Sequence, residues 1–86
     1  MKIKNGYILK EVAGRYFAVA LGDVNENKMI TINESAKTIW DILSSDTTED
    51  EIIRIMSDKY DAPTEVLRKD INNFIEILRR ENILEE

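Results

Sequence analysis

The chain has 86 residues, a hydrophobic share of 43%, a charged share of 34% and a net charge of −5. This composition is typical of a folded, soluble chain, and the length fits one domain over residues 1–86. The absence of cysteine and histidine excludes disulfides, thiolate metal sites and catalysis by a nucleophile–histidine pair. A domain of this size buries only roughly 60–65% of its unfolded surface, so we expect binding at an edge or in a groove.

The charge is unevenly placed along the chain. Residues 1–45 carry six basic and five acidic side chains, whereas residues 46–86 carry six basic and twelve acidic ones. An acidic domain is a poor ligand for nucleic acid. No segment approaches the roughly 18 apolar residues that span a bilayer, and residues 1–10 lack the apolar core of a signal peptide. We therefore expect a cytoplasmic protein with no membrane or nucleic-acid partner.

The first third of the chain is predicted to form three strands. Alternating apolar residues and turn residues place them at about 6–12, 16–21 and 29–32. Ala13-Gly14 is a turn signal, because glycine tolerates a positive φ. Short connections predict an antiparallel meander in which the first and third strands are the edges. On the middle strand, Ala18 and Ala20 share a thin face that suits a covering helix or an approaching partner.

The rest of the chain is predicted to form three helices. Helical spacing of apolar residues places them at about 34–45, 49–60 and 64–81. Asn33 is a good N-cap, Thr48 and Glu51 form a capping box, and Asn82 fits the left-handed closing position. Trp40 falls on the apolar stripe of the first helix, which indicates a core residue. This order predicts an α+β fold, a three-stranded antiparallel sheet followed by a three-helix bundle, with the parts of a winged helix.

Carboxylates are the only catalytic groups that the composition leaves. Glu49, Asp50 and Glu51 cluster at one helix start, where acidic residues complement the helix dipole. The three glycines form no phosphate-binding loop. We therefore predict no enzymatic activity, no cofactor and no metal.

Two arginines on the third helix, Arg68 and Arg79, can be interpreted in two ways. Arg68, Ile75 and Arg79 fall near one angular sector of this helix. The arginines are either solvated, or they flank a groove and hold an acidic peptide.

A short turn between the second and third helices also permits a helix-turn-helix reading, and thus a DNA-binding regulator. Glu65, Asp70 and Glu76 on the third helix would face phosphates in several docking poses, which disfavours DNA binding.

A structural module that forms a homodimer through a strand edge is a third alternative.

The stretch 29–36 (MITINESA), followed by Ile39-Trp40, resembles the signature of the PqqD-like family. Its members are recognition elements for the precursors of ribosomally synthesised and post-translationally modified peptides. The similarity extends over nearly the whole chain, through Gly6-Tyr7, Gly14, Asp70-Ile71, Phe74-Ile75 and Leu78. Departures are Ile32 for leucine, Ser35 for threonine, Pro63 for a capping residue and Asn82 for glycine. They leave the fold assignment intact and do not indicate which precursor is bound.

This resemblance implies that the leader segment of a precursor peptide adds as a further strand beside the third strand, in the groove against the third helix. It also implies a partner modifying enzyme, often a radical S-adenosylmethionine maturase, which performs the chemistry. The domain itself would raise the local concentration of precursor near that enzyme. Monomer and homodimer both remain open.

An edge strand offers unpaired N–H and C=O groups as a template for another chain, so the residues themselves favour compatible parts. The expected peptide-binding residues are Met29, Ile30, Thr31, Ile32, Leu67, Arg68, Ile71, Phe74, Ile75, Leu78 and Arg79. The sequence leaves open which helix residues face the core and which face the groove. It also leaves open whether the Thr31 N–H points to a guest strand or into its own sheet, and whether Met29 is a core filler or an exposed contact.

Overall fold

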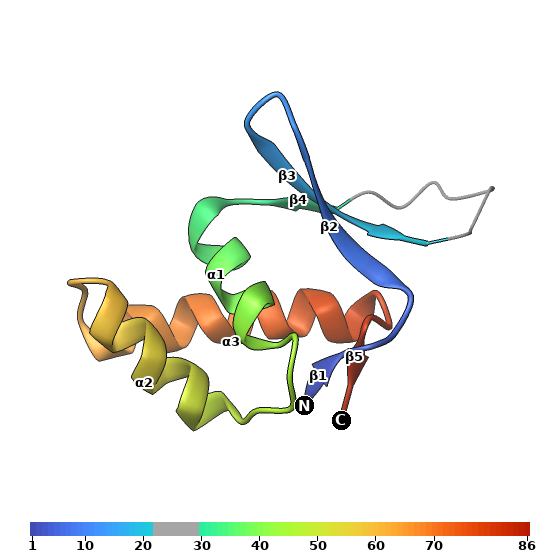
Figure 1. Cartoon of the computed structure of the whole chain (residues 1–86). Coiled ribbons are helices and arrows are strands. Elements are labelled where there is room, and N and C mark those ends of the chain that lie inside the picture. Colours follow the sequence, from blue (N-terminus) through green and yellow to red (C-terminus); the bar gives the residue numbers. More distant parts are fainter. Residues whose placement is uncertain (22–29) are drawn as a thin grey trace.

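The computed structural model describes residues 1–21 and 30–86, and it confirms the expected α+β fold (Figure 1). Its elements in chain order are β1 (Lys2–Ile3), β2 (Tyr7–Val12), β3 (Arg15–Ala20), β4 (Ile30–Ile32), α1 (Glu34–Ile42), α2 (Glu49–Lys59), α3 (Thr64–Arg80) and β5 (Leu84–Glu85). The first helix ends earlier than the expected range 34–45. The strands β1 and β5 were not expected from the sequence.

The main sheet has three antiparallel strands in the order β2-β3-β4. Tyr7 lies opposite Ala20 on the β2–β3 side, and Tyr16 lies opposite Ile32 on the β3–β4 side. The expected meander is therefore present, with β2 and β4 as its two edges.

A two-residue turn joins β2 to β3. Ala13 and Gly14 both have positive φ, 53° and 80°, as the mirror-image turns of tight hairpins require. Glycine meets this requirement without a clash, whereas a left-handed alanine costs about 1 kcal/mol. The sequence predicted the positive φ of Gly14, but it did not predict the positive φ of Ala13.

One face of the sheet is covered by helices and the other is open. Ala18 and Ile32 on the covered face are each 2% exposed. Ile8 and Val12 on the other face are 39% and 50% exposed. The alanine face of β3 is thus the core face, where small side chains let the helices approach.

Side-chain caps fix where α1 and α2 begin. The Asn33 side-chain oxygen accepts from the Ala36 N–H at 2.8 Å, and Thr48 Oγ1 accepts from the Glu51 N–H at 3.2 Å. Pro63 caps α3 without a side-chain bond, but its carbonyl accepts from the N–H groups of the first turn. The N-caps that were predicted from the sequence, Asn33 and Thr48, are therefore confirmed.

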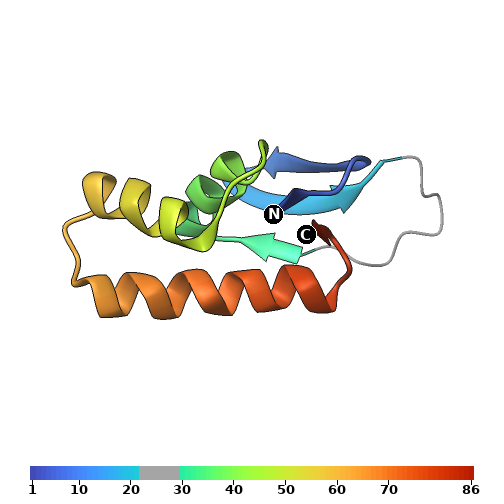
Figure 2. The same ribbon diagram turned by 90° about the horizontal axis from the view of Figure 1, so that it is seen from below.

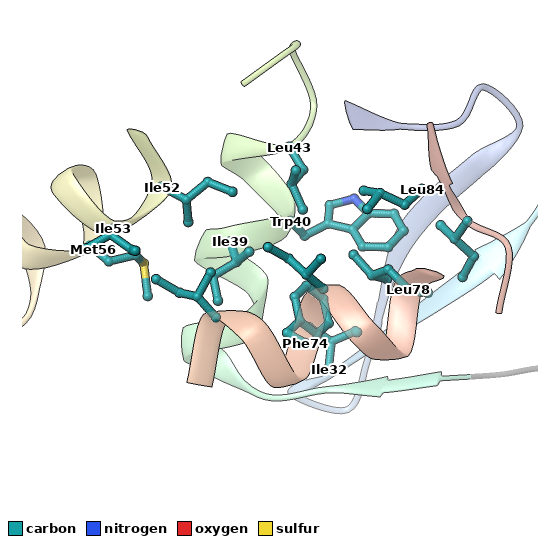
Figure 3. Close-up of a cluster of buried hydrophobic side chains, with 14 of the residues drawn as sticks. Ile32, Ile39, Trp40, Leu43, Ile52, Ile53, Met56, Phe74, Leu78 and Leu84 are labelled. Carbon is teal, nitrogen blue, oxygen red and sulfur yellow. The ribbon is translucent and has the colours of Figure 1, made fainter. Parts of the chain in front are cut away.

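The helices bury one continuous core against the sheet (Figure 3). Ile39 and Trp40 of α1, Ile52 and Met56 of α2, and Leu78 of α3 are each at most 5% exposed. Trp40 is a core residue, as its place on the apolar stripe indicated. No helix in the described ranges is long and apolar enough to cross a membrane.

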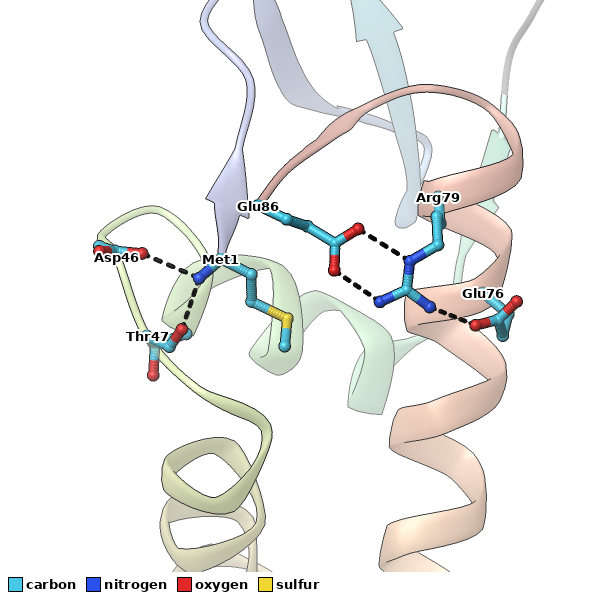
Figure 4. Close-up of polar contacts among 6 residues, drawn as sticks. All are labelled: Met1, Asp46, Thr47, Glu76, Arg79 and Glu86. Carbon is cyan, nitrogen blue, oxygen red and sulfur yellow. Dashed lines mark hydrogen bonds and ion pairs between the residues drawn. The ribbon is translucent and has the colours of Figure 1, made fainter.

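The two ends of the described chain meet beside α3. Strand β1 pairs antiparallel with β5, with Ile3 opposite Leu84. Asn82 has a φ of 60° and turns the chain back after α3, so that Ile83 and Leu84 are buried. Figure 4 shows the Met1 amino group bound to Asp46 close to this pair. The left-handed closing residue was expected, but the strand that follows it was not.

Candidate peptide-binding edge and groove

The hydrogen bonds of the β2–β3 hairpin determine which way each main-chain group points. In an antiparallel pair, opposed residues alternate between pairs that exchange hydrogen bonds and pairs that do not. The Leu21 N–H donates to the Gly6 carbonyl at 2.6 Å, which identifies one bonded pair. Counting in steps of two along the register, Lys10 opposite Phe17 is a bonded pair as well. Phe17 therefore directs its N–H and C=O groups toward β2.

The same alternation leaves the main-chain N–H and C=O groups of Thr31 in β4 without a partner in the sheet. Phe17 lies opposite Thr31, and its polar main-chain groups are already used by β2. The bonded pairs between β3 and β4 are thus Tyr16 with Ile32 and Ala18 with Ile30. The N–H and C=O groups of Thr31 point away from the sheet, and no other described residue bonds them. This resolves the direction that the sequence had left open.

A hollow borders this free edge. It encloses about 270 Å³ and is lined from β4, α1 and α3 by Thr31, Asn33, Ser35, Ala36, Ile39, Asp70, Asn73, Phe74 and Ile77. Figure 2 draws β4 between β3 and α3, with the strand and the helix running alongside each other. We call this hollow and the outer edge of β4 the β4–α3 groove.

The floor of the β4–α3 groove is apolar. Ile39 and Phe74 are 2% and 7% exposed, so each presents only a small part of its surface to the groove. Ile77 stands at the rim and is 36% exposed. Such a surface suits one apolar guest side chain, because covering Ile77 and the floor removes apolar area from water.

The rim of the groove is polar. Asp70 and Asn73 line it from exposed positions on α3. Asn33 lines it from the end of β4, but its side chain is engaged as the α1 cap. Asp70 has no hydrogen-bond or ion-pair partner among the described residues. The groove therefore offers one unpaired carboxylate beside an apolar floor.

Several expected helix residues form the core beneath this groove. Leu67, Ile71, Ile75 and Leu78 are at most 5% exposed, and none of them lines the hollow. Phe74 both packs in the core and lines the hollow. The broad apolar stripe of α3 is therefore mainly the surface that attaches the helix.

The structure does not bring Arg68, Ile75 and Arg79 into the hollow. Residues two apart on a helix differ by about 200°, so Arg79 and Ile77 lie on opposite sides of α3. Arg79 instead binds Glu86 at 2.7 Å and also pairs with Glu76 (Figure 4). The carboxylate of Glu86 raises the pKa of Arg79, so this guanidinium stays charged.

On the strand, Ile30 is half-buried, Thr31 is exposed and Ile32 is buried. Met29 lies outside the described residues. Sequence reasoning missed Asp70, Asn73 and Ile77 as groove residues. A signal for them exists, because Ile77 and Val66 are apolar residues outside the main stripe, three turns apart on one side of α3.

A second hollow of about 410 Å³ lies toward the hairpin turn and shares Thr31 and Asn33 with the first. Arg15 and Glu34 line it with opposite charges, together with Tyr16. Lys37 lies over the Tyr16 ring, 5.5 Å from its centre, and binds Asp41 at 3.0 Å. That hydrogen bond raises the pKa of Lys37. This hollow has no single charge preference.

The groups needed for metal catalysis are not gathered anywhere in the part of the chain that the structure describes. Within residues 1–21 and 30–86, no three carboxylates lie close enough to hold an ion. The geometry is that of a binding surface, with free main-chain groups, an apolar floor and a polar rim.

Comparison with known proteins agrees with this class. Residues 8–84 match the family model of coenzyme PQQ synthesis protein D, PqqD, and the chain therefore belongs to the PqqD family. A solved structure described as TbiB1 in complex with the TbiA(beta) leader peptide has the same fold, with a TM-score of 0.78 and 18% sequence identity. The match covers 99% of this chain and 95% of that one. No curated protein matches the chain significantly.

Proposed function

We propose that this domain binds the leader segment of a ribosomally made precursor peptide by strand addition. The guest strand pairs with the outer edge of β4, and its inward side chains enter the β4–α3 groove. Membership of the PqqD family supports this function, as does the shared fold with a protein whose structure contains a leader peptide.

One observation carries the proposal. The Thr31 N–H and C=O groups point away from the sheet next to a hollow with an apolar floor. Unpaired main-chain groups on an edge are a template for an extended chain. The guest gains main-chain hydrogen bonds from Thr31, and the groove selects its side chains.

The expected residues take different parts in this proposal. Thr31 forms the pairing edge, and Ile30 precedes it on β4. Phe74 supplies the apolar floor of the groove, and Ile77 forms part of its rim. Five further residues were expected to bind the peptide but are buried in the core, where they position β4 and α3 on either side of the groove: Ile32, Leu67, Ile71, Ile75 and Leu78. Arg68 and Arg79 lie on the far side of α3 and are left out of the proposed site.

We propose no catalytic role for the domain itself. It contains no histidine or cysteine, and its described part gathers no metal-binding group. The modification then belongs to a partner enzyme, for which the family resemblance favours a radical S-adenosylmethionine maturase in the cytoplasm. Binding near that enzyme raises the effective concentration of the precursor.

A titration monitored by amide NMR tests this function. The ligands are synthetic leader segments of short precursors encoded beside this gene, with scrambled peptides of equal composition as controls. We expect one peptide per chain, with shifts concentrated at residues 30–33 and 70–77. Binding that shifts only α2 or the hairpin turn would contradict strand addition at β4.

Sedimentation in the same samples separates the homodimer alternative. A dimer that pairs through β4 occupies the Thr31 groups, so adding peptide must dissociate it if the proposed function holds. A dimer that persists while bound to peptide uses another surface. A dimer through β4 that excludes the peptide would contradict the proposal.

A further inference from the structure

The described lining of the β4–α3 groove carries a negative charge and no positive one. Among the described residues that line it, Asp70 is the one that carries a charge. Arg68 and Arg79, for which the sequence left open a role in holding an acidic peptide, lie on the other side of α3. The charge that meets the guest in the groove is therefore negative.

The Asp70 carboxylate is available to a ligand. It is exposed and has no ion-pair or hydrogen-bond partner among the described residues. The neighbouring cations of α3 on this side, Lys69 and Arg80, do not line the hollow. A cationic guest side chain would supply the missing partner without breaking an existing contact.

The distance between Asp70 and Ile77 determines how far apart in the guest sequence the two residues that contact them lie. Ile77 follows Asp70 by seven positions, which is about 10 Å along α3 at a rise of ~1.5 Å per residue. A guest strand alongside advances about 3.4 Å per residue, and its side chains share a face every second residue. Side chains of the same face that are two or four positions apart are separated by about 7 Å or about 14 Å, which brackets this distance. A long lysine or arginine side chain spans the difference, so such a pair reaches the Ile77 rim and the Asp70 carboxylate together.

We infer that the peptide recognised by this chain carries a lysine or arginine for Asp70, two or four positions from an aliphatic or aromatic residue that fills the Ile39–Phe74–Ile77 pocket. This inference rests on the proposed function and names the ligand class of the same groove. Asp70 is then a specificity-determining residue, and a leader with a glutamate at the position that faces Asp70 binds more weakly.

Selection from a displayed library of random ten-residue peptides tests the inference on the full chain. The same library is selected on the wild type, Asp70→Lys, Asp70→Asn and Asp61→Lys. Asp61→Lys is the matched control, because it makes the same charge change at an exposed aspartate that does not line the groove. The Kd of the best peptide is then measured against its Lys→Glu counterpart.

We expect the wild type and Asp61→Lys to enrich an apolar residue with a lysine or arginine two or four positions away. Asp70→Lys should enrich aspartate or glutamate there, and Asp70→Asn should show no charge preference. The Lys→Glu peptide should bind the wild type about 3- to 10-fold more weakly, as reversal of an exposed ion pair allows. Asp70→Lys should restore its binding.

Two failures are distinguishable. Apolar enrichment that maps to the groove, with no charge preference or with the same preference on Asp70→Lys, overturns the role of Asp70 and leaves the proposed function standing. Absence of any enriched peptide on the folded wild type, together with no leader binding in the NMR titration, overturns both.

Discussion

The two edges of the three-stranded sheet both carry free main-chain groups, yet they differ in what surrounds those groups. On β2, the alternation leaves Tyr7, Leu9 and Glu11 with outward N–H and C=O groups, because the bonded pairs are the residues between them. On β4, the corresponding residue is Thr31. Within the described residues, β2 therefore has more free main-chain groups than β4.

Charge and shape nevertheless favour β4. Strand β2 carries the exposed residues Lys10 and Glu11, and charges on an edge discourage pairing with another strand. The three described residues of β4, Ile30–Ile32, carry no charge, and this strand borders the hollow against α3. No residue of β2 lines either of the two hollows. Under the proposed function, the uncharged strand and the neighbouring hollow distinguish β4, which receives the guest, from β2, which offers free main-chain groups alone.

The largest expected effect is on stability. It tests whether one side of α3 packs in the core while the other side lines the groove beside β4. Ile71 is 0% exposed, and Ile71→Ala should lower the free energy of unfolding by about 2–5 kcal/mol. Chemical denaturation measures this loss. Ile77→Ala at the groove rim should cost less than about 1 kcal/mol, because Ile77 is partly exposed in the free protein. Equal losses would contradict the division of α3 into a core side and a groove side.

Proline substitution compares the two edges directly. Thr31→Pro removes an outward N–H and places a ring where the guest strand lies, so the Kd for the leader should rise by about 10-fold or more. The β3–β4 ladder does not use this N–H, so the fold should persist. Isothermal titration calorimetry measures the Kd.

Glu11→Pro is the matched control on the other edge, because it also removes an outward N–H from an edge strand. Leader binding should be unchanged in this variant. Loss of binding in Glu11→Pro with retention in Thr31→Pro would assign the guest strand to β2 instead.

A smaller effect is expected from the groove wall. Ile77→Ser should weaken leader binding by about 3- to 10-fold, because the guest side chain loses an apolar contact. Ile8→Ser is matched in residue type and exposure, since Ile8 is 39% exposed and Ile77 36%. Ile8 lies on the open face of the sheet, so its variant should bind normally. Fluorescence anisotropy with a labelled leader peptide resolves such differences.

The smallest effect concerns the hairpin turn, which belongs to neither edge. Ala13 has a positive φ of 53°, so Ala13→Gly should raise the free energy of unfolding by about 0.5–1 kcal/mol. Leader binding should not change. Thermal unfolding followed by circular dichroism measures the gain, and a lower midpoint would show that the left-handed alanine carries no strain.

Local signals in the sequence were sufficient for most of the fold. Asn33, Thr48 and Asn82 mark helix ends because their side chains or backbone preferences act within a few residues. The pairing of β1 with β5 could not be predicted in this way. Each strand has two residues, too few for an alternating pattern, and their contact joins opposite ends of the chain.

The candidate groove was predictable in position but not in detail. The edge and the third helix followed from strand order and from the family resemblance. The lining of the groove depends on which sector of α3 faces β4, and helical spacing alone does not give that sector. For this reason Ile71 and Ile75 were grouped with Phe74, and Arg68 was placed beside a groove that Asp70 in fact lines.

Amide hydrogen exchange at Thr31 tests the central claim most directly. In the free protein the Thr31 and Glu11 amides should both exchange rapidly, because both N–H groups point away from the sheet. Saturating leader peptide should slow exchange at Thr31 by at least about tenfold and leave Glu11 unchanged. Protection of Glu11 with no change at Thr31 would contradict the account, as would a Thr31 amide already protected in the free monomer.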